Sequence, residues 1–247
     1  NAAINKSKNP VIVRVDAHAE LQRNYISLAI DVMKSSGAVN VGGIMGAEGN
    51  TFFEKTVAAA MRSSLGVGAS RFHTGGEAGY VDTVYLGTFL RSAVIAIGGF
   101  DERFIRAQDW ELNYRLRQAG GKIFFDPRLH VTYRPRSSVK ALAKQYFEYG
   151  RWRRVVSRRH QGTINYRYLA PPFALIGTAL SIVLALMINQ IFIIPAAIYG
   201  IFLILASLIT GKGIIEKLLL PIVLFTMQMS WGLGFLTSPK TLAPSKG

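Results

Sequence analysis

The chain has 247 residues, half of them hydrophobic, and 29 Lys and Arg against 14 Asp and Glu give it a formal net charge of +15. It has no cysteine, which excludes disulfides and thiolate metal sites. A basic excess of this size indicates an anionic partner, such as nucleic acid, lipid head groups or a phosphorylated substrate. Because the chain starts at Asn1 and reaches a strand-like segment almost at once, we expect its domain to lack N-terminal strands.

Strand-like and helix-like segments alternate through the first half of the chain. Short runs rich in β-branched and aromatic residues predict strands at 11–15, 39–45, 80–86, 122–125 and 130–133. Apolar residues at helical spacing predict helices at 20–36, 51–65, 92–97 and 108–119. Thr51 and Glu54 have the spacing of a capping box, and the glycine-rich residues 66–79 are expected to form a loop. This alternation predicts an α/β sheet domain.

A long basic helix and three apolar segments follow. The helix is predicted at 137–160, and the apolar segments lie at about 169–188, 191–210 and 218–236. A membrane-spanning helix needs about 20 apolar residues, and the third segment meets this less well because it contains Gln228 and Ser230. We therefore predict a catalytic domain at 1–136, a basic interfacial helix at 137–168, and a membrane region of two to three helices at 169–238.

The position of the basic residues favours a membrane over nucleic acid. Ten of them lie between Arg134 and Arg167, directly before the first apolar segment, where a cytoplasmic membrane surface attracts positive charge. The alternative is an ordinary surface helix packed on the sheet. We predict a multi-pass protein of the cell (inner or plasma) membrane that contacts anionic lipids, binds no nucleic acid and keeps its catalytic domain in the cytoplasm.

The topology of the third apolar segment is left open by the sequence. If the first two segments form a hairpin, Lys212 and Lys217 lie on the cytoplasmic side, as the positive-inside rule favours. A third span would place the basic residues 240–246 outside, against that rule. A third segment lying in the membrane interface would keep them inside.

Asp16 and His18 follow the first predicted strand. Residues two apart on a strand point the same way, so a carboxylate and an imidazole emerge together at the strand's end. Ligands bind at such edges of α/β sheets, and one carboxylate with substrate phosphates commonly holds Mg²⁺ or Mn²⁺. The alternative is a solvated Asp in a turn.

Asp109 falls in the first turn of the helix predicted at 108–119, after a loop that begins at Gly98 and Gly99. The helix dipole favours an ionised carboxylate at that place, and a general base must be ionised at neutral pH. Helix capping explains the same residue without any chemistry, because acids are common in first turns.

Three further polar residues accompany these two acids. Arg134 and Arg136 flank a proline, and arginine binds phosphate through two parallel hydrogen bonds, although a solvated basic corner is an equal explanation. Asp82 follows the glycine-rich loop and is a candidate for a sugar or acceptor contact, or simply a turn residue.

The ordered set of motifs resembles a known family. It runs Asp-Ala-His-Ala, Val-Asp-Thr, Gly-Gly-Phe-Asp-Glu, Gln-Asp-Trp-Glu-Leu-Asn and Tyr-Arg-Pro-Arg-Ser, followed by a Gln-Tyr-Phe-Glu-Tyr-Gly-Arg-Trp-Arg helix and apolar hairpins. Over about residues 9 to 168 the chain resembles the family-2 inverting glycosyltransferases, in particular the membrane-anchored branch of the succinoglycan-type exopolysaccharide enzymes. The resemblance implies a partial GT-A domain, Rossmann-like and specific for nucleotide-diphosphate sugars, followed by transmembrane helices.

The resemblance also implies roles for individual residues. Asp16 and His18 match the metal motif that holds Mn²⁺ or Mg²⁺ against the nucleotide diphosphate, and Asp109 matches the catalytic base. Trp110 and Glu111 would flank the acceptor. The acceptor channel would be shaped by an element that contains Gln145, Arg151 and Trp152. The implied partners are a nucleotide-sugar donor and a polyprenyl-linked or glycan acceptor.

The chain departs from the family's pattern at three places. His18 replaces the usual second Asp of the metal motif, which puts metal affinity and metal choice in question. Gln108 replaces the acid that often precedes the base. Gln145 lies too far from Arg151 and Trp152 for the motif of processive members, so we do not predict a processive polymerase.

Three other functions compete with transfer onto a growing lipid-linked saccharide. A non-catalytic basic module that binds anionic lipid or nucleic acid would explain the charge and the apolar tail, but not the placed acids. A transporter would be expected to carry ionisable groups inside its spans, and these segments have almost none. The remaining alternative is sugar transfer onto polyprenyl phosphate itself.

Overall fold

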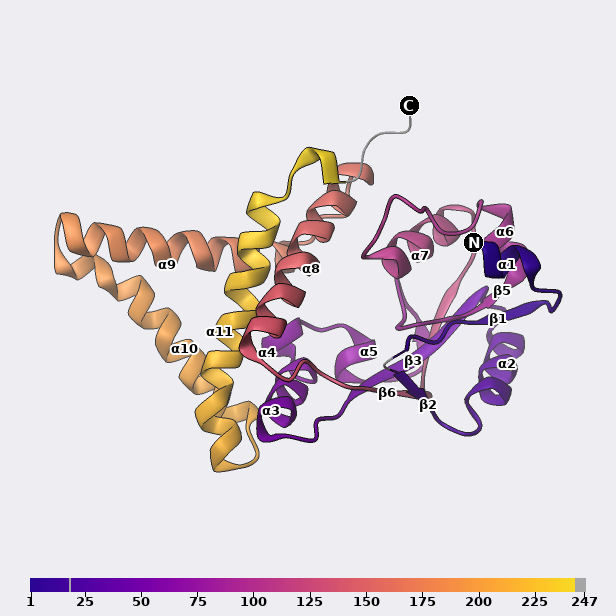
Figure 1. The fold of residues 1–247 in the computed structure, drawn as a ribbon, viewed down its shortest axis with the longest axis horizontal. Coiled ribbons are helices and arrows are strands. Elements are labelled where there is room, and N and C mark those ends of the chain that lie inside the picture. Colours follow the sequence, from indigo (N-terminus) through magenta and orange to yellow (C-terminus); the bar gives the residue numbers. More distant parts are fainter. Residues whose placement is uncertain (18, 243–247) are drawn as a thin grey trace. The chain divides into compact units, whose positions relative to one another are not determined.

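The computed structural model describes residues 1–17 and 19–242 (Figure 1). The chain divides into two compact units. Unit 1 comprises residues 1–48 and 69–134, and unit 2 comprises residues 49–68 and the chain from Pro135 onward. The sequence places 49–68 in the first domain, whereas in the structure this segment packs with the C-terminal helices.

Unit 1 is built on a six-stranded mixed sheet. The strand order is β1-β5-β3-β6-β2, and β4 also pairs with β6. Of these pairs, only β3 and β6 run parallel. The strands are β1 Val11–Val13, β2 Ala19–Leu21, β3 Asn40–Ala47, β4 Gly79–Tyr80, β5 Thr88–Leu90 and β6 Ile123–Tyr133.

Helices cover the two faces of this sheet with separate hydrophobic clusters. The helix α2 (Tyr25–Ser36) packs through Ala29 and Val32 onto one face, and α7 (Gln108–Gln118) packs through Leu112 and Leu116 onto the other. The short helices α1 (Ala2–Lys6), α5 (Arg71–Thr74) and α6 (Arg91–Ala96) complete unit 1. The burial of these apolar stripes is the main favourable free energy of the fold.

The strand β6 changes its buried face halfway along its length. Ile123 and Phe125 belong to the cluster under α7, but Leu129 and Val131 belong to the cluster under α2. Opposite β3 the register shifts between Gly42 and Ile44, which pair with Phe125 and His130. The irregularity gives β6 three extra residues, and an odd number reverses the in-and-out alternation of a strand.

The structure corrects three predicted elements of unit 1. The predicted strand 80–86 is wrong, because only Gly79–Tyr80 pairs there and a turn with positive φ at Leu86 and Gly87 leads into β5. The predicted helix 20–36 begins later, at Tyr25, because Ala19–Leu21 pairs with β6. The two strands predicted around Asp126 and Pro127 form one continuous strand, β6.

Unit 2 consists of helices. Its first segment forms α3 (Phe52–Met61) and α4 (Ser64–Val67), which split the helix predicted at 51–65. The predicted capping box at α3 is confirmed: Thr51 Oγ1 accepts from the Glu54 N–H at 3.2 Å, and Glu54 Oε2 accepts from the Thr51 N–H at 3.0 Å. The basic helix is α8 (Val139–Arg159).

Three apolar helices end unit 2. They are α9 (Ala170–Met187), α10 (Ile194–Thr210) and α11 (Ile214–Thr237). Each is long and apolar enough to cross a membrane, α10 when the 3-10 turn that precedes it is included. Their mean hydropathies, in chain order, are 2.0, 2.5 and 1.6. The three helices differ in how much of their surface is covered. The helix α11 packs against α3, α8, α9 and α10, whereas α9 and α10 leave most of their surface exposed.

Candidate active site

Two of the predicted acids of unit 1 meet at one arginine. Arg14 donates from Nε and Nη2 to Asp16 Oδ1 at 3.3 and 3.2 Å, and its Nη1 donates to Asp109 Oδ1. All three side chains are about one quarter exposed. The structure therefore brings together the strand-end carboxylate and the helix-start carboxylate, which lie 93 positions apart in the sequence.

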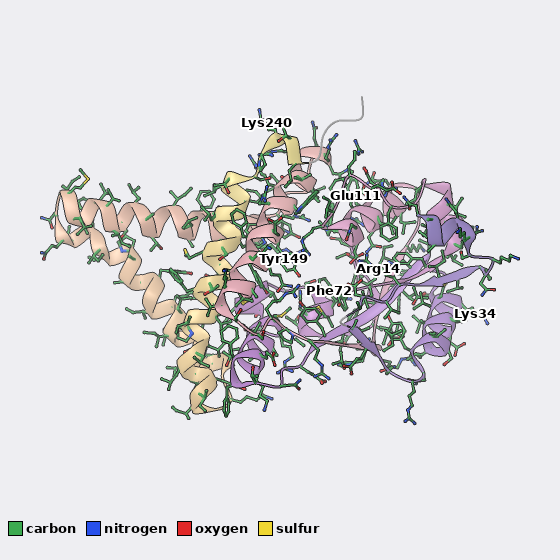
Figure 2. The ribbon with its side chains drawn as sticks, viewed as in Figure 1. Arg14, Lys34, Phe72, Glu111, Tyr149 and Lys240 are labelled. Carbon is green, nitrogen blue, oxygen red and sulfur yellow. The ribbon has the colours of Figure 1, made fainter. Side chains whose placement is uncertain are left out.

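The strand β1 positions Arg14 and Asp16. Backbone pairing continues one residue past the strand, because the Arg14 N–H donates to the Gly87 carbonyl at 3.2 Å. Beyond Asp16 the chain turns, and the Ala19 N–H donates to the Asp16 carbonyl at 3.0 Å. Figure 2 shows Arg14 at the strand layer and Glu111 on α7. The guanidinium carbon of Arg14 also lies 5.6 Å from the centre of the Phe100 ring.

Asp109 is presented by a tightly held helix start. Ala107, the N-cap of α7 two residues before Asp109, has a φ of 60°, in the left-handed region that a non-glycine residue adopts at a cost of about 1–3 kcal/mol. The Asp109 carboxylate lies in the first turn, where the helix dipole favours its charged form.

Glu111 fixes this helix start from the buried side. Its side chain is 1 % exposed, and Oε1 and Oε2 each accept from Arg115 at 2.7 Å. Arg115 in turn donates to the carbonyls of Ile97 and Gly99 at 2.8 Å. The buried Glu111, through Arg115, therefore joins α7 to the glycine loop before it, and its predicted acceptor contact stays a prediction.

A buried amide chain attaches α7 to the sheet. Asn40 Nδ2 in β3 donates to Asn113 Oδ1 at 2.7 Å, and Asn113 Nδ2 donates to Thr83 Oγ1 at 2.9 Å. Asn113 lies one helical turn after Asp109, so these bonds hold the face of α7 that carries Asp109. Asn113 ends the Gln-Asp-Trp-Glu-Leu-Asn motif, and this spacing was the available signal for it.

The predicted residues Trp110 and Asp82 lie along the partly exposed side of α7. Trp110 stacks on Tyr114 with ring centres 5.5 Å apart, and the Arg117 guanidinium lies 5.8 Å from the Tyr114 ring. Arg117 Nη1 pairs with Asp82 Oδ1 at 3.2 Å. Asp82 therefore meets the C-terminal half of α7, while Asp109 lies at its start.

Arg134 lies at the end of β6 between two carboxylates. It pairs with Glu20 at 3.3 Å and with Glu48 at 3.6 Å, and these side chains are between two fifths and two thirds exposed. A surface pair of this kind contributes little stability, so its charges are available to a ligand. His18 lies outside the described residues.

The remaining predicted residues belong to unit 2. Gln145 is buried on α8 and donates from Nε2 to the Tyr149 hydroxyl at 2.8 Å. Arg151 pairs with Glu148 at 2.9 Å, and Trp152 is 2 % exposed. Arg136 is half-buried just before the helix. These contacts are within α8, and the predicted acceptor role of the four residues stays a prediction.

Two titratable groups of unit 1 outside the site have strongly lowered pKa values. Hydrogen bonds from Arg103 lower the pKa of Asp101 to about 2. Burial lowers the pKa of His73 to about 4, and its Nδ1 is buried without a hydrogen-bond partner among the described residues. His73 is therefore neutral at physiological pH. Sequence reasoning missed Arg14, although it lies in the predicted strand 11–15, two residues before Asp16, and residues two apart on a strand point the same way.

Comparison with known proteins gives two relatives. The chain is 28% identical to the succinoglycan biosynthesis protein ExoA of Rhizobium meliloti, over 91% of this chain and 68% of that protein. It is 26% identical to the dolichyl N-acetyl-alpha-D-glucosaminyl phosphate 3-beta-D-2,3-diacetamido-2,3-dideoxy-beta-D-glucuronosyltransferase of Methanococcus voltae, over 95% of this chain and 72% of that protein. No family model matches the chain.

Proposed function

We propose that this chain is a membrane-anchored glycosyltransferase that transfers a sugar, with inversion, from a nucleotide-diphosphate donor to a lipid-linked or glycan acceptor. The similarity to one protein of succinoglycan biosynthesis and to one glycosyltransferase named for a dolichyl-phosphate sugar supports sugar transfer. The main structural support for an active site is that Arg14 pairs with both Asp16 and Asp109. The apolar helices support a membrane location.

In the proposed reaction, Asp109 acts as the general base. It takes the proton from an acceptor hydroxyl while that oxygen forms a bond to the anomeric carbon of the donor sugar. The bond from that carbon to the β-phosphate oxygen breaks on the opposite face, and the nucleoside diphosphate leaves. Attack from the face opposite the leaving group inverts the anomeric configuration. Most of the acceleration comes from holding these groups in line.

Arg14 links donor binding to the activation of Asp109 in the proposed reaction. Its guanidinium pairs with both carboxylates and offsets their negative charge. A diphosphate entering the site offers the guanidinium a bidentate partner of higher charge. Movement of Arg14 toward the phosphates would free the Asp109 carboxylate to accept the acceptor's proton, so donor binding would activate the base.

The residues present fit a divalent cation held mainly by the donor. Asp16 offers one partly exposed carboxylate, and within residues 1–17 and 19–242 no group of three or more His, Asp and Glu side chains gathers. Mg²⁺ and Mn²⁺ are commonly bound by one or two carboxylates together with substrate phosphates and water. Such an ion would offset the charge of the leaving nucleoside diphosphate.

The acceptor and the location follow from the same chemistry. A lipid-linked acceptor has its phosphate at the membrane surface, where the basic residues of α8 would also lie. The basic excess on the chain before α9 supports a cytoplasmic location of unit 1 under the positive-inside rule. The alternative function, a non-catalytic basic module that binds anionic lipid, gives no reason for two acids to converge on Arg14.

Release of nucleoside diphosphate tests the proposal. The chain, in membranes, would be given a panel of nucleotide sugars with Mn²⁺ or Mg²⁺ and a polyprenyl-linked acceptor. Asp109→Asn is expected to lower turnover by about 10²–10⁴-fold, because it removes the base. The matched control is Asp31→Asn, the same change at an exposed acid on α2. Equal loss in both variants, or none in Asp109→Asn, would refute Asp109 as the base, and absence of turnover with every donor would favour the lipid-binding module.

A further inference from the structure

The apolar helix α11 has both of its ends attached to other elements of unit 2. Just before it, the Thr210 hydroxyl lies 3.2 Å from the Ser63 hydroxyl at the start of α4. Just after it, Arg158 of α8 donates to the carbonyls of Ser238 and Pro239 at 2.9 and 3.1 Å. All of these residues belong to unit 2.

Both α4 and α8 must lie on the side of unit 1. The segment that carries α4 leaves unit 1 at Glu48 and rejoins it at Ala69, and α8 begins five residues after Arg134. In the described part of the chain, the helices able to cross a membrane all follow Tyr168. A helix that crossed the bilayer would have its ends on opposite sides, about 30 Å apart along the membrane normal.

Close packing keeps α11 on those elements along its length. The main chain of Gly234 lies against the Phe147 carbonyl of α8, and that of Gly150 lies against the Trp231 carbonyl, so that an added Cβ would come within 2.0 Å in each case. Near its middle, Gln228 donates to the Leu65 carbonyl of α4 at 3.4 Å. Figure 1 shows α8 and α11 side by side.

The charge on α8 prevents this pair from sinking into the bilayer together. Seven of its 21 residues are cationic, namely Lys140, Lys144, Arg151, Arg153, Arg154, Arg158 and Arg159. Each cationic side chain costs about 2.5–3.5 kcal/mol at the centre of a membrane helix. A helix that carries seven of them stays at the surface, and α11 stays with it.

The free side of α11 is one continuous apolar stripe. It consists of Ile215, Leu218, Ile222, Phe225, Leu233 and Leu236, each at least 39 % exposed, and the half-buried Met229 between Phe225 and Leu233 completes the helical spacing of three and four residues. The opposite side, which includes Leu220 and Leu224, is buried in unit 2. The pair of α11 and the basic α8 thus combines an exposed apolar stripe with cationic residues, the combination found in helices that lie in the membrane interface.

Positive charge marks both ends of the stripe. Lys212 and Lys217 lie at the start of α11, and Arg154 and Lys240 lie at its end, where Lys240 is exposed (Figure 2). The guanidinium of Arg154 lies 5.0 Å from the Phe235 ring. Cations beside aromatic rings suit the head-group layer, and their presence at both ends matches two ends on the cytoplasmic side.

We propose that α11 does not cross the membrane but lies in the plane of one leaflet, with its apolar stripe among the acyl chains and its cationic ends among anionic head groups. The helices α9 and α10 then form the crossing hairpin, and the chain after α11 returns to the side of unit 1. The surface formed by α11 and α8 is thus a docking face for a single lipid monolayer.

Cysteine accessibility tests this topology, because the native chain has no cysteine. Single cysteines would be placed at three exposed positions of the full chain: Lys8 in unit 1, Gln190 at the turn between α9 and α10, and Lys240 after α11. Membranes of right-side-out and inside-out orientation would be treated with a membrane-impermeant maleimide. We expect Lys240→Cys to react from the same side as Lys8→Cys and Gln190→Cys from the opposite side. Reaction of Lys240→Cys together with Gln190→Cys would overturn the proposal.

A depth measurement gives an independent reading. Bimane would be attached to cysteines at Leu218, Phe225 and Leu236, which lie along the stripe, and quenched by lipids brominated at different acyl positions. An in-plane helix gives about the same depth at all three positions, whereas a spanning helix gives its greatest depth at Phe225. Neither assay depends on sugar transfer, so failure of the proposed enzymatic function would leave both readouts intact.

Discussion

Arg14 contacts both acids of the candidate site. Its replacement therefore tests the proposed role of this residue in binding the donor and in activating Asp109. We expect Arg14→Gln to lower kcat/KM for the donor by about 10- to 100-fold, since a hydrogen bond to a charged group contributes about 1.5–3 kcal/mol. Arg14→Lys keeps the charge but loses the planar fork, so it should restore binding only in part. Steady-state kinetics with varied donor concentration measures both effects.

Arg91→Gln is the matched control, because Arg91 donates to the Ile4 carbonyl and to Ser7, away from both acids. If Arg14→Gln left kcat/KM for the donor within twofold of the native chain, the arginine would have no part in donor binding or activation. Equal losses in both variants would indicate a general effect on the fold of unit 1.

His73 makes unit 1 sensitive to acid. Its folded-state pKa is lowered to about 4 by burial, from an ordinary value near 6.5. Between these values the unfolded chain binds more protons than the folded chain, so stability is complete above about pH 6.5 and falls as the pH drops toward 4. We expect His73→Gln to flatten this loss by about 3 kcal/mol, measured by denaturant unfolding between pH 7 and 4.

His130→Gln serves as the comparison, because it removes a histidine on β6 in the same unit. A pH profile of the His73 variant that stayed parallel to that of the native chain would show that His73 does not cause the acid sensitivity. Asp101 does not contribute to the loss of stability between pH 7 and 4. Hydrogen bonds from Arg103 lower the pKa of its carboxyl to about 2, so the stabilising pair with Arg103 is lost only below about pH 4.

At the scale of elements, the pairing of α8 with α11 depends on two glycines. A methyl group at Gly150 would lie 2.0 Å from the Trp231 carbonyl oxygen, a backbone atom that cannot move aside cheaply. We therefore expect Gly150→Ala to destabilise unit 2 by about 1–3 kcal/mol, even though alanine is the better helix former. Thermal unfolding of the detergent-solubilised chain measures this.

Gly177→Ala on α9 is the control for this substitution. An added Cβ there meets nothing within 4 Å, so only the helix propensity changes and the variant should be as stable as the native chain or slightly more so. Gly150→Ala with the same stability as Gly177→Ala would mean that the close approach of α8 and α11 is not required.

The sequence predicted those parts of the fold that depend on local pattern. The capping box at Thr51, the start of α7 and the three apolar helices follow from residue spacing alone. The position of the acids at a strand end and a helix start also follows from it, although their chemical roles stay predictions. Contacts between distant segments have no such signal: a turn at Leu86 and Gly87 ends the predicted strand 80–86, and Gly150 of α8 meets Trp231 of α11.

At the scale of the whole molecule, the membrane region and the preceding chain are not separable parts. The sequence predicts a catalytic domain, a basic interfacial helix and a membrane region in succession. In the structure α3 and α8 both pack against α11, and the buried residues of α8 include Leu142, Tyr146 and Trp152. Removal of α9 to α11 would expose apolar faces of both helices to water.

A chain that ends at residue 168 tests this dependence. We expect it to aggregate or to bind lipid vesicles, because exposed side chains of this kind cost about 25 cal/mol for each Å² of apolar surface. Size-exclusion chromatography and vesicle flotation, compared with the full chain in detergent, distinguish these outcomes from a monomer in solution. A monomeric product with a cooperative thermal transition would show that α3 and α8 fold without α11. The lipid-facing helices would then be an anchor only, rather than part of the structure that supports unit 2.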